Sequence, residues 1–213
     1  MIGKKAFTAL LVLSAFVASI YSPIKILPLT LPMRTSTSPY NTLWNGTSEF
    51  YKALVDEGYE VHTVNSLNDI DRLITINDSI LYIVIAPDIP FTQVEVERLL
   101  NTLSKVRELA FLIADENITS NALLSQLFNI SVTGIVLKDK NSPYGPLYPI
   151  ITCKLNNTEY VIVLNIASYI IIESSKGKDI LSKLNDKPVI VYCFTKKYKG
   201  IVIADSSIFI KHI

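Results

Sequence analysis

Residues 81–117 read LYIVIAPDIPFTQVEVERLLNTLSKVRELAFLIADEN, and this stretch decides the fold class. Its two apolar runs, residues 81–87 and 109–114, are continuous rather than alternating in polarity. Such runs are typical of strands that a parallel sheet buries on both faces. The segment between them has a helical pattern and is long enough for a right-handed crossover helix. The stretch therefore predicts a strand–helix–strand unit and an α/β fold.

The rest of the chain extends this unit on both sides. Thr92 and Glu95 predict a capping box at the start of the central helix. Apolar spacing and turn signals predict further helices over 48–58, 67–76, 119–128 and 177–184, and strands over 59–64, 134–137, 150–155, 160–166, 169–172, 188–194 and 200–204. We therefore predict a mostly parallel sheet flanked by helices, with antiparallel strands added to the same sheet in the C-terminal third.

The N-terminus predicts export. Lys4 and Lys5 precede residues 6–21, an uncharged and mostly apolar run. We interpret residues 1–22 as an uncleaved signal-anchor helix that holds the remaining chain outside the cell membrane, with a cleaved signal peptide and a secreted protein as the alternative. Residues 23–39 are rich in Pro, Thr and Ser and predict an extended spacer. Residues 40–213 then form a single α/β domain.

Five Asn-x-Ser/Thr triplets agree with an external location. A glycan on such a triplet requires a surface position. The candidate glycosylation sites are Asn45, Asn77, Asn117, Asn129 and Asn156. The two cysteines, Cys153 and Cys193, allow a disulfide in an oxidising compartment, and the alternative is two small buried side chains on neighbouring strands.

Acidic residues follow three of the predicted strands. In parallel sheets, ligands bind outside the carboxyl ends of the strands, so these acids would converge if their strands are neighbours. Carboxylate and hydroxyl oxygens suit Ca²⁺ or Mg²⁺, the only cofactors that we consider. The alternative, which we favour, is that each acid caps a helix or closes a turn. The candidate residues are Asp88, Asp115, Glu116, Asp205 and Ser206.

Several function classes are excluded by composition and motifs. The net charge of +1 gives no electrostatic basis for nucleic-acid binding, and we interpret Lys196, Lys197 and Lys199 as a solvated hairpin end. Two histidines and seven glycines make a histidine-based triad, a zinc site or a phosphate-binding loop improbable.

Several segments resemble the domain-of-unknown-function family 4350. They are SPYN at 38–41, NGTSEFY at 45–51, GYEV at 58–61, IVIAPD at 83–88, LIADE at 112–116 and GIVIADSSIFI at 200–210. The resemblance implies a flavodoxin-like fold of the class I glutamine-amidotransferase type, commonly tethered to membranes in archaea and bacteria. The chain departs from catalytic amidotransferases because neither cysteine has flanking glycines. The resemblance therefore implies a catalytically degenerate member.

Three functions remain open from the sequence. The first is a membrane-tethered extracellular domain that binds a ligand or a protein of the cell envelope without catalysis. The second is a hydrolase-like enzyme with a carboxylate or metal site. The third is an accessory subunit for transport or envelope assembly, which would use an exposed apolar face.

Overall fold

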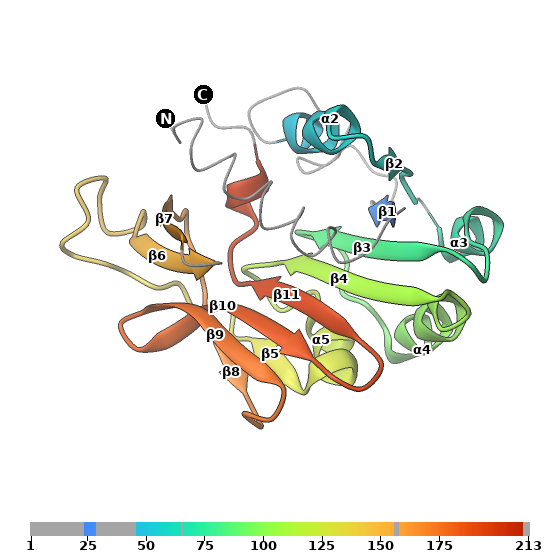
Figure 1. The fold of residues 1–213 in the computed structure, drawn as a ribbon. Helices are drawn as coiled ribbons and strands as arrows, with labels where there is room; N and C mark the ends of the chain where they lie inside the picture. The colour runs from blue at the N-terminus through green and yellow to red at the C-terminus, as the bar shows by residue number, and fades with distance from the viewer. Residues whose placement is uncertain (1–23, 29–45, 65, 156–157, 211–213) are drawn as a thin grey trace.

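The computed structural model describes residues 24–28, 46–64, 66–155 and 158–210. Within these ranges, seven strands form one sheet in the order β2-β1-β3-β4-β11-β10-β9 (Figure 1). Neighbouring strands from β2 to β11 are parallel, and β10 is antiparallel to both β11 and β9. The strands of this sheet are β1 (Ile24–Pro28), β2 (Glu60–Val61), β3 (Ser79–Ile85), β4 (Glu108–Ala114), β9 (Lys178–Leu184), β10 (Lys187–Phe194) and β11 (Lys199–Ile203).

Helices cover both faces of this sheet (Figure 1). Helices α4 (Gln93–Leu103) and α5 (Asn121–Phe128) lie on one side, and α3 (Leu67–Leu73) packs beside α4. On the other side lie α2 (Ser48–Asp56) and the short 3₁₀ helix η1 (Ser207–Phe209), which meet through the rings of Phe50 and Phe209, 4.7 Å apart.

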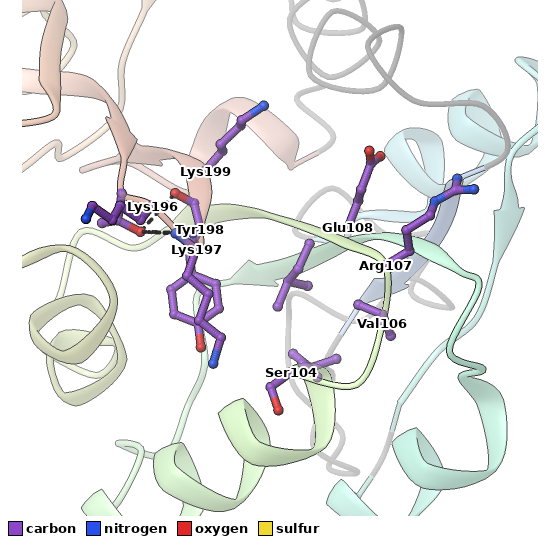
Figure 2. A pocket seen from close by; sticks show the side chains of 11 residues that line it. Ser104, Val106, Arg107, Glu108, Lys196, Lys197, Tyr198 and Lys199 are labelled. Atoms are coloured by element: carbon purple, nitrogen blue, oxygen red, sulfur yellow. Dashed lines mark hydrogen bonds between the residues drawn. The ribbon is translucent and has the colours of Figure 1, made fainter.

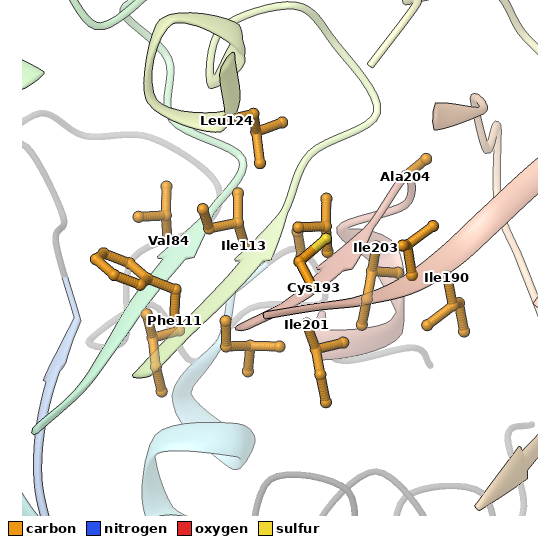
Figure 3. Packing of buried hydrophobic residues seen from close by; sticks show 14 of the residues in the cluster. Val84, Phe111, Ile113, Leu124, Ile190, Cys193, Ile201, Ile203 and Ala204 are labelled. Carbon is orange, nitrogen blue, oxygen red and sulfur yellow. The ribbon is translucent and has the colours of Figure 1, made fainter. Parts of the chain in front are cut away.

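The strand–helix–strand unit predicted from residues 81–117 is confirmed as β3-α4-β4. Strands β3 and β4 pair in parallel over their whole lengths. The predicted capping box is also present, because the Glu95 amide donates to Thr92 Oγ1 while the Thr92 amide donates to Glu95 Oε2. The predicted burial of these strands is also present. Phe111 and Ile113 on β4 are fully buried beside residues of β3, β10, β11 and α5 (Figure 3).

Two small sheets stand apart from the main one, which corrects part of the predicted arrangement. Strand β5 (Ile130–Val132) pairs with β8 (Ile170–Ile172), and β6 (Ile150–Leu155) pairs with β7 (Thr158–Val163). Within the described ranges, only β9 and β10 add antiparallel strands to the main sheet. The predicted strand over 134–137 is wrong, because pairing in this region uses Ile130–Val132 and Gly134 turns the chain with a φ of +69°.

The predicted helix over 177–184 is also wrong, because this segment is strand β9. It pairs with β10 across a two-residue connection, Asn185-Asp186, in which both residues have positive φ. Such a pair of angles is characteristic of the tight type I′ hairpin turn, whose twist matches that of the flanking strands. The hairpin turn therefore overrides the helical spacing of the apolar residues.

The predicted spacer over residues 23–39 contains a strand of the main sheet. Residues 24–28 form β1, which pairs in parallel with β2 on one side and β3 on the other. Ile24, Ile26 and Leu27 supply the β propensity that the prolines of this segment obscured. Residues 1–22 and 29–45 lie outside the described ranges, and within those ranges no helix combines the length and apolarity that a membrane span requires.

We expect Gly177→Ala to lower the free energy of unfolding by about 2 kcal/mol. Gly177 has a φ of +71°, and a Cβ atom at this position would lie 2.1 Å from the backbone oxygen of Phe194. The Gly177 carbonyl also accepts a hydrogen bond from the Phe194 amide, so the backbone cannot move without breaking this contact. Urea unfolding measures the effect. Gly145→Ala is the control, because Gly145 also has a positive φ, +103°, but a Cβ atom there would meet only Tyr148 Cδ2, at 3.9 Å. Equal losses for both variants would contradict the steric part of the argument.

Candidate functional site

Strands β3, β4 and β11 are neighbours, so their acidic termini do gather at one edge of the sheet. We call this end, where the three parallel strands finish, the carboxyl edge. Asp88 follows β3, Asp115 and Glu116 follow β4, and Asp205 follows β11. The adjacency that the sequence prediction required is therefore present.

Asp115 organises the turn that leads into α5. Its carboxylate accepts hydrogen bonds from the amides of Asn117 and Ser120 at 2.9 and 2.8 Å, and from Thr119 Oγ1 at 2.7 Å. Burial raises the pKa of Asp115, and these hydrogen bonds oppose the rise because they stabilise the charged form. The residue thus closes a turn, as the favoured alternative for these acids predicted.

Asp205 has a similar role on β11 and is more deeply buried. The side chain is fully enclosed, and its two oxygens accept from the amides of Asn165 at 2.7 Å and Ser207 at 2.8 Å. Burial raises the pKa of Asp205 to about 7, even though both amides favour the carboxylate. Asp205 therefore fixes the loop before β8 to the end of β11.

Glu116 and Ser206 connect the two neighbouring turns. The Ser206 amide donates to Glu116 Oε2 at 3.0 Å, and Ser206 itself is buried. Asp88, in contrast, is exposed to solvent beyond the end of β3. Among the described residues, no group of three or more His, Cys, Asp or Glu side chains is arranged to hold a metal ion. The Ca²⁺ or Mg²⁺ site, which was the less favoured interpretation of these acids, stays a hypothesis.

Backbone strain is concentrated at the same edge. Ala86, directly after β3, has a φ of +41°, and Ile166, beside the Asp205 contact, has a φ of +59°. A left-handed conformation is unfavourable for a β-branched residue such as isoleucine, and strained residues of this kind often mark functional regions. The Ile166 amide donates to the Leu147 carbonyl at 2.9 Å, while 45% of the Ile166 residue surface is exposed. The fold thus holds an apolar side chain in solvent at a cost in backbone energy.

Ile166 is one of six exposed apolar residues, on segments near the carboxyl edge, that sequence reasoning missed. We call this set the edge patch, and its members are Ile89, Ile118, Ile135, Val136, Leu147 and Ile166, each 38–60% exposed.

Two backbone hydrogen bonds connect segments of the edge patch, and a third segment lies close by. The Phe91 amide donates to the Thr119 carbonyl, and the Leu137 amide donates to the Ala167 carbonyl. Ile118 Cγ2 lies only 3.4 Å from where a Cβ atom on Gly134 would stand. Because clustered exposed apolar side chains mark interaction surfaces, the edge patch is the best candidate for a binding site at this edge.

The cysteines form no disulfide, which corrects one of the two sequence interpretations. Cys153 on β6 and Cys193 on β10 are free and buried, and their strands belong to different sheets. Burial raises the pKa of Cys153 to about 11 and that of Cys193 to about 12, so both remain protonated at neutral pH. Neither thiol has the thiolate character that a nucleophile needs.

The predicted glycosylation sites lie at the surface wherever the structure describes them. Asn77, Asn117 and Asn129 are exposed, whereas Asn45 and Asn156 lie outside the described residues. Asn117 directly precedes Ile118, so a glycan on Asn117 would border the edge patch. The presence of glycans stays a prediction.

Comparisons with known proteins concern the fold and the family. The solved structure of the mmIFT52 N-terminal domain is similar over 87% of this chain and 88% of its own, with a TM-score of 0.61 and 15% identity. Cytoplasmic Protein STM1381 from Salmonella typhimurium LT2 is similar over 85% and 87%, with a TM-score of 0.53 and 12% identity. An exo-beta-1,4-mannosidase, Op5Man5 from Opitutaceae bacterium strain TAV5, aligns with 92% of this chain but 33% of its own, with a TM-score of 0.50 and 10% identity. At these identities the similarity concerns the fold alone.

A family model gives the more specific comparison. No curated protein matches the chain. The model described as domain of unknown function (DUF4350) matches residues 39–140, from before α2 to the loop after β5. The similar segment at 200–210 lies beyond this range. The match over residues 39–140 supports the DUF4350 family for this chain.

Proposed function

We propose that this chain is a non-catalytic protein-binding domain of the cell envelope, and that the edge patch contacts its partner. The observation that carries the proposal is the exposure of Ile166 in a strained conformation, together with the exposure of five other apolar residues on the connected segments. Such strain persists where the surrounding structure enforces it, and it is concentrated in binding and switching regions. We expect the partner to present apolar side chains to the edge patch and a basic side chain to Asp88 at its border.

The polar groups near the edge patch favour binding over catalysis. Asp115, Glu116 and Asp205 all accept hydrogen bonds from backbone amides, which fixes their positions. His62 lies away from these acids on the chain after β2, where its Nε2 contacts Glu60 Oε1 at 2.7 Å. We therefore assign the acids a structural role: they hold the loops that display the patch.

The proposal includes a fold type and a location. We propose that the domain has a flavodoxin-like fold of the amidotransferase type. In this proposal the chain keeps the fold of the amidotransferases but lacks their catalytic groups. The apolar run over residues 6–21 after Lys4 and Lys5 supports an N-terminal membrane anchor with the domain outside the cell. The exposed sequon asparagines, Asn77, Asn117 and Asn129, agree with a glycoprotein, and the family resemblance suggests an archaeal source.

One observation favours a second candidate, a carboxylate-based hydrolase-like enzyme. The pKa of Asp205 is raised to about 7, which suits an acid or base working at neutral pH. Asp205 is nevertheless fully enclosed, so a substrate would reach it only after the loop that carries Asn165 had moved. Because of this requirement, we rank the enzyme below the binding domain. We also rank it below an accessory subunit for transport or envelope assembly, which would use the edge patch in the same way.

Affinity capture with matched variants tests the proposal. We expect the tagged full chain to capture a specific envelope protein from its native membranes. The double variant Ile118→Glu, Ile135→Glu should capture less than one-tenth of that amount, which corresponds to binding on the order of tenfold weaker. Ile76→Glu is the control, because Ile76 is 75% exposed but precedes β3 at the other end of the sheet. Equal retention by the double variant, or equal loss with the control, would reject the edge patch as the binding surface.

A further inference from the structure

A hollow lies at the opposite end of the sheet from the edge patch. We call this end, where β4 and β11 begin, the amino edge. Its volume is about 280 Å³, and it lies between the turn after α4 and the hairpin that joins β10 to β11 (Figure 2). The two sides come from residues 103–109 and 195–199. These segments are far apart in sequence and are brought together by the parallel pairing of β4 with β11.

The lining of this hollow is strongly basic. Arg107, Lys196, Lys197 and Lys199 supply four positive charges, and Glu108 supplies one negative charge. The whole chain has a net charge of only +1, so the local excess is a particular feature of this end. Among the described residues, the ion pairs His62–Glu60 and Lys105–Asp71 include none of these cations, and Lys196 and Lys197 have no carboxylate partner.

The backbone that carries these lysines is held firmly. Thr195 Oγ1 accepts hydrogen bonds from the amides of Lys197 at 3.2 Å and Tyr198 at 2.9 Å. The Tyr198 ring packs edge-on against the fully buried Phe111, with 5.8 Å between the ring centroids. Across the hollow, Arg107 Nη2 donates to Oγ of the buried Ser79 at 2.8 Å, which orients the guanidinium. Basic side chains on a rigid backbone lose less conformational entropy on binding than basic side chains on a mobile loop.

Apolar groups form the base of the same hollow. Leu103 is buried, and Val106, Leu109 and Tyr198 are half-buried. Figure 2 shows Lys197 and Tyr198 extending in the same direction, while Arg107, Glu108 and Lys199 point to the opposite side and Lys196 extends away from both groups. A ligand beside Tyr198 would therefore meet an aromatic ring and the ammonium group of Lys197 together. Lys196 adds a second charge on a long and flexible stem.

We propose that this hollow binds a small organic phosphate, with the phosphate against Lys196 and Lys197 and the organic part against Tyr198. The volume of about 280 Å³ lies just below the roughly 300–1,000 Å³ typical of small-molecule sites, so the ligand is small. A phosphate is the anion that suits several ammonium donors without a single fixed geometry. The site is separate from the edge patch, so it adds a ligand to the proposed function and does not depend on it.

Titration with phenyl phosphate, followed by the amide resonances of the full chain in a nonionic detergent, tests the inference. We expect shifts confined to residues 103–109 and 195–199, and tighter binding of phenyl phosphate than of inorganic phosphate because the ring contacts Tyr198. The double variant Lys196→Gln, Lys197→Gln is expected to bind about tenfold more weakly. The control Lys154→Gln, Lys183→Gln removes the same charge from exposed positions on β6 and β9 and is expected to bind within about twofold of the native chain.

Vesicles separate a soluble phosphate from a lipid head group. Binding to vesicles of phosphatidylglycerol in phosphatidylcholine, without shifts from phenyl phosphate, would overturn the small-ligand site and assign the lysines to a membrane surface. Shifts spread over other lysines, or equal weakening in both double variants, would also overturn it. All three outcomes leave the capture experiment on the edge patch unaffected, so the two proposals fail independently.

Discussion

Asp205→Ala is expected to lower the free energy of unfolding by about 3–5 kcal/mol at neutral pH. The substitution leaves the amides of Asn165 and Ser207 without their acceptor in a fully buried position. Each unsatisfied buried donor costs about 1–3 kcal/mol, and the lost side chain leaves a cavity. Urea unfolding measures the loss. Asp88→Ala is the control, since Asp88 is exposed, and it should change stability by less than about 0.5 kcal/mol.

The pH dependence of stability gives a second measurement on Asp205. Its pKa is about 7 in the folded protein and about 3.9 in an unfolded chain, so between these values the folded state holds more protons. Its contribution is therefore fully present below about pH 4 and is lost as the pH rises through about 7, by up to ~4 kcal/mol. Asp115 acts in the same direction, because its pKa is also raised.

Asp205→Asn isolates this contribution, because asparagine has nearly the same shape and does not titrate. The difference in unfolding free energy between the native chain and Asp205→Asn should favour the native chain most near pH 4.5 and shrink toward pH 8. Urea titrations at four or five pH values provide the comparison. A difference that stays constant with pH, or grows with it, would contradict a raised pKa at Asp205.

The central part of the fold was predictable because its signals are local. The unbroken apolar runs of β3 and β4 indicate burial on both faces, and Thr92 and Glu95 locate the start of α4 within a residue. Where two local signals competed, the sequence was ambiguous. In β9 the apolar spacing predicted a helix, whereas the left-handed pair Asn185-Asp186 and the pairing with β10 decided for a strand.

The candidate site was predictable only in part, because its contacts join distant positions. The sequence located the acids at strand ends, but the partner of Asp205 is an amide 40 residues away, and Ser206 bonds to Glu116 across 90 residues. The edge patch is harder still, since an isoleucine such as Ile118 or Ile135 is expected in the core. Their exposure follows from the arrangement of the loops, and no local sequence pattern indicates it.

Phe111→Ala is the second substitution with a large expected effect, about 3–5 kcal/mol lost from the free energy of unfolding. Phe111 is fully buried on β4, and its ring contacts those of Tyr82, Phe128 and Tyr198 at centroid distances of 6.0, 6.3 and 5.8 Å. Its removal leaves a cavity between β3, α5 and the start of β11, and the neighbouring rings are too rigid to fill it. Leucine at this position should cost roughly half as much, because it keeps part of the volume.

Phe194→Ala is the matched control, because Phe194 is 43% exposed and packs mainly beside Tyr192. Urea unfolding should give it less than half of the loss seen for Phe111→Ala. Hydrogen exchange adds a local measurement: without Phe111 the ring of Tyr198 loses its buried neighbour, so the amides of residues 195–198 should exchange faster than in Phe194→Ala. The alternative outcome is a large loss of global stability with unchanged hydrogen exchange in this hairpin. It would mean that Thr195 alone fixes the hairpin and that the Tyr198–Phe111 contact does not support the basic hollow.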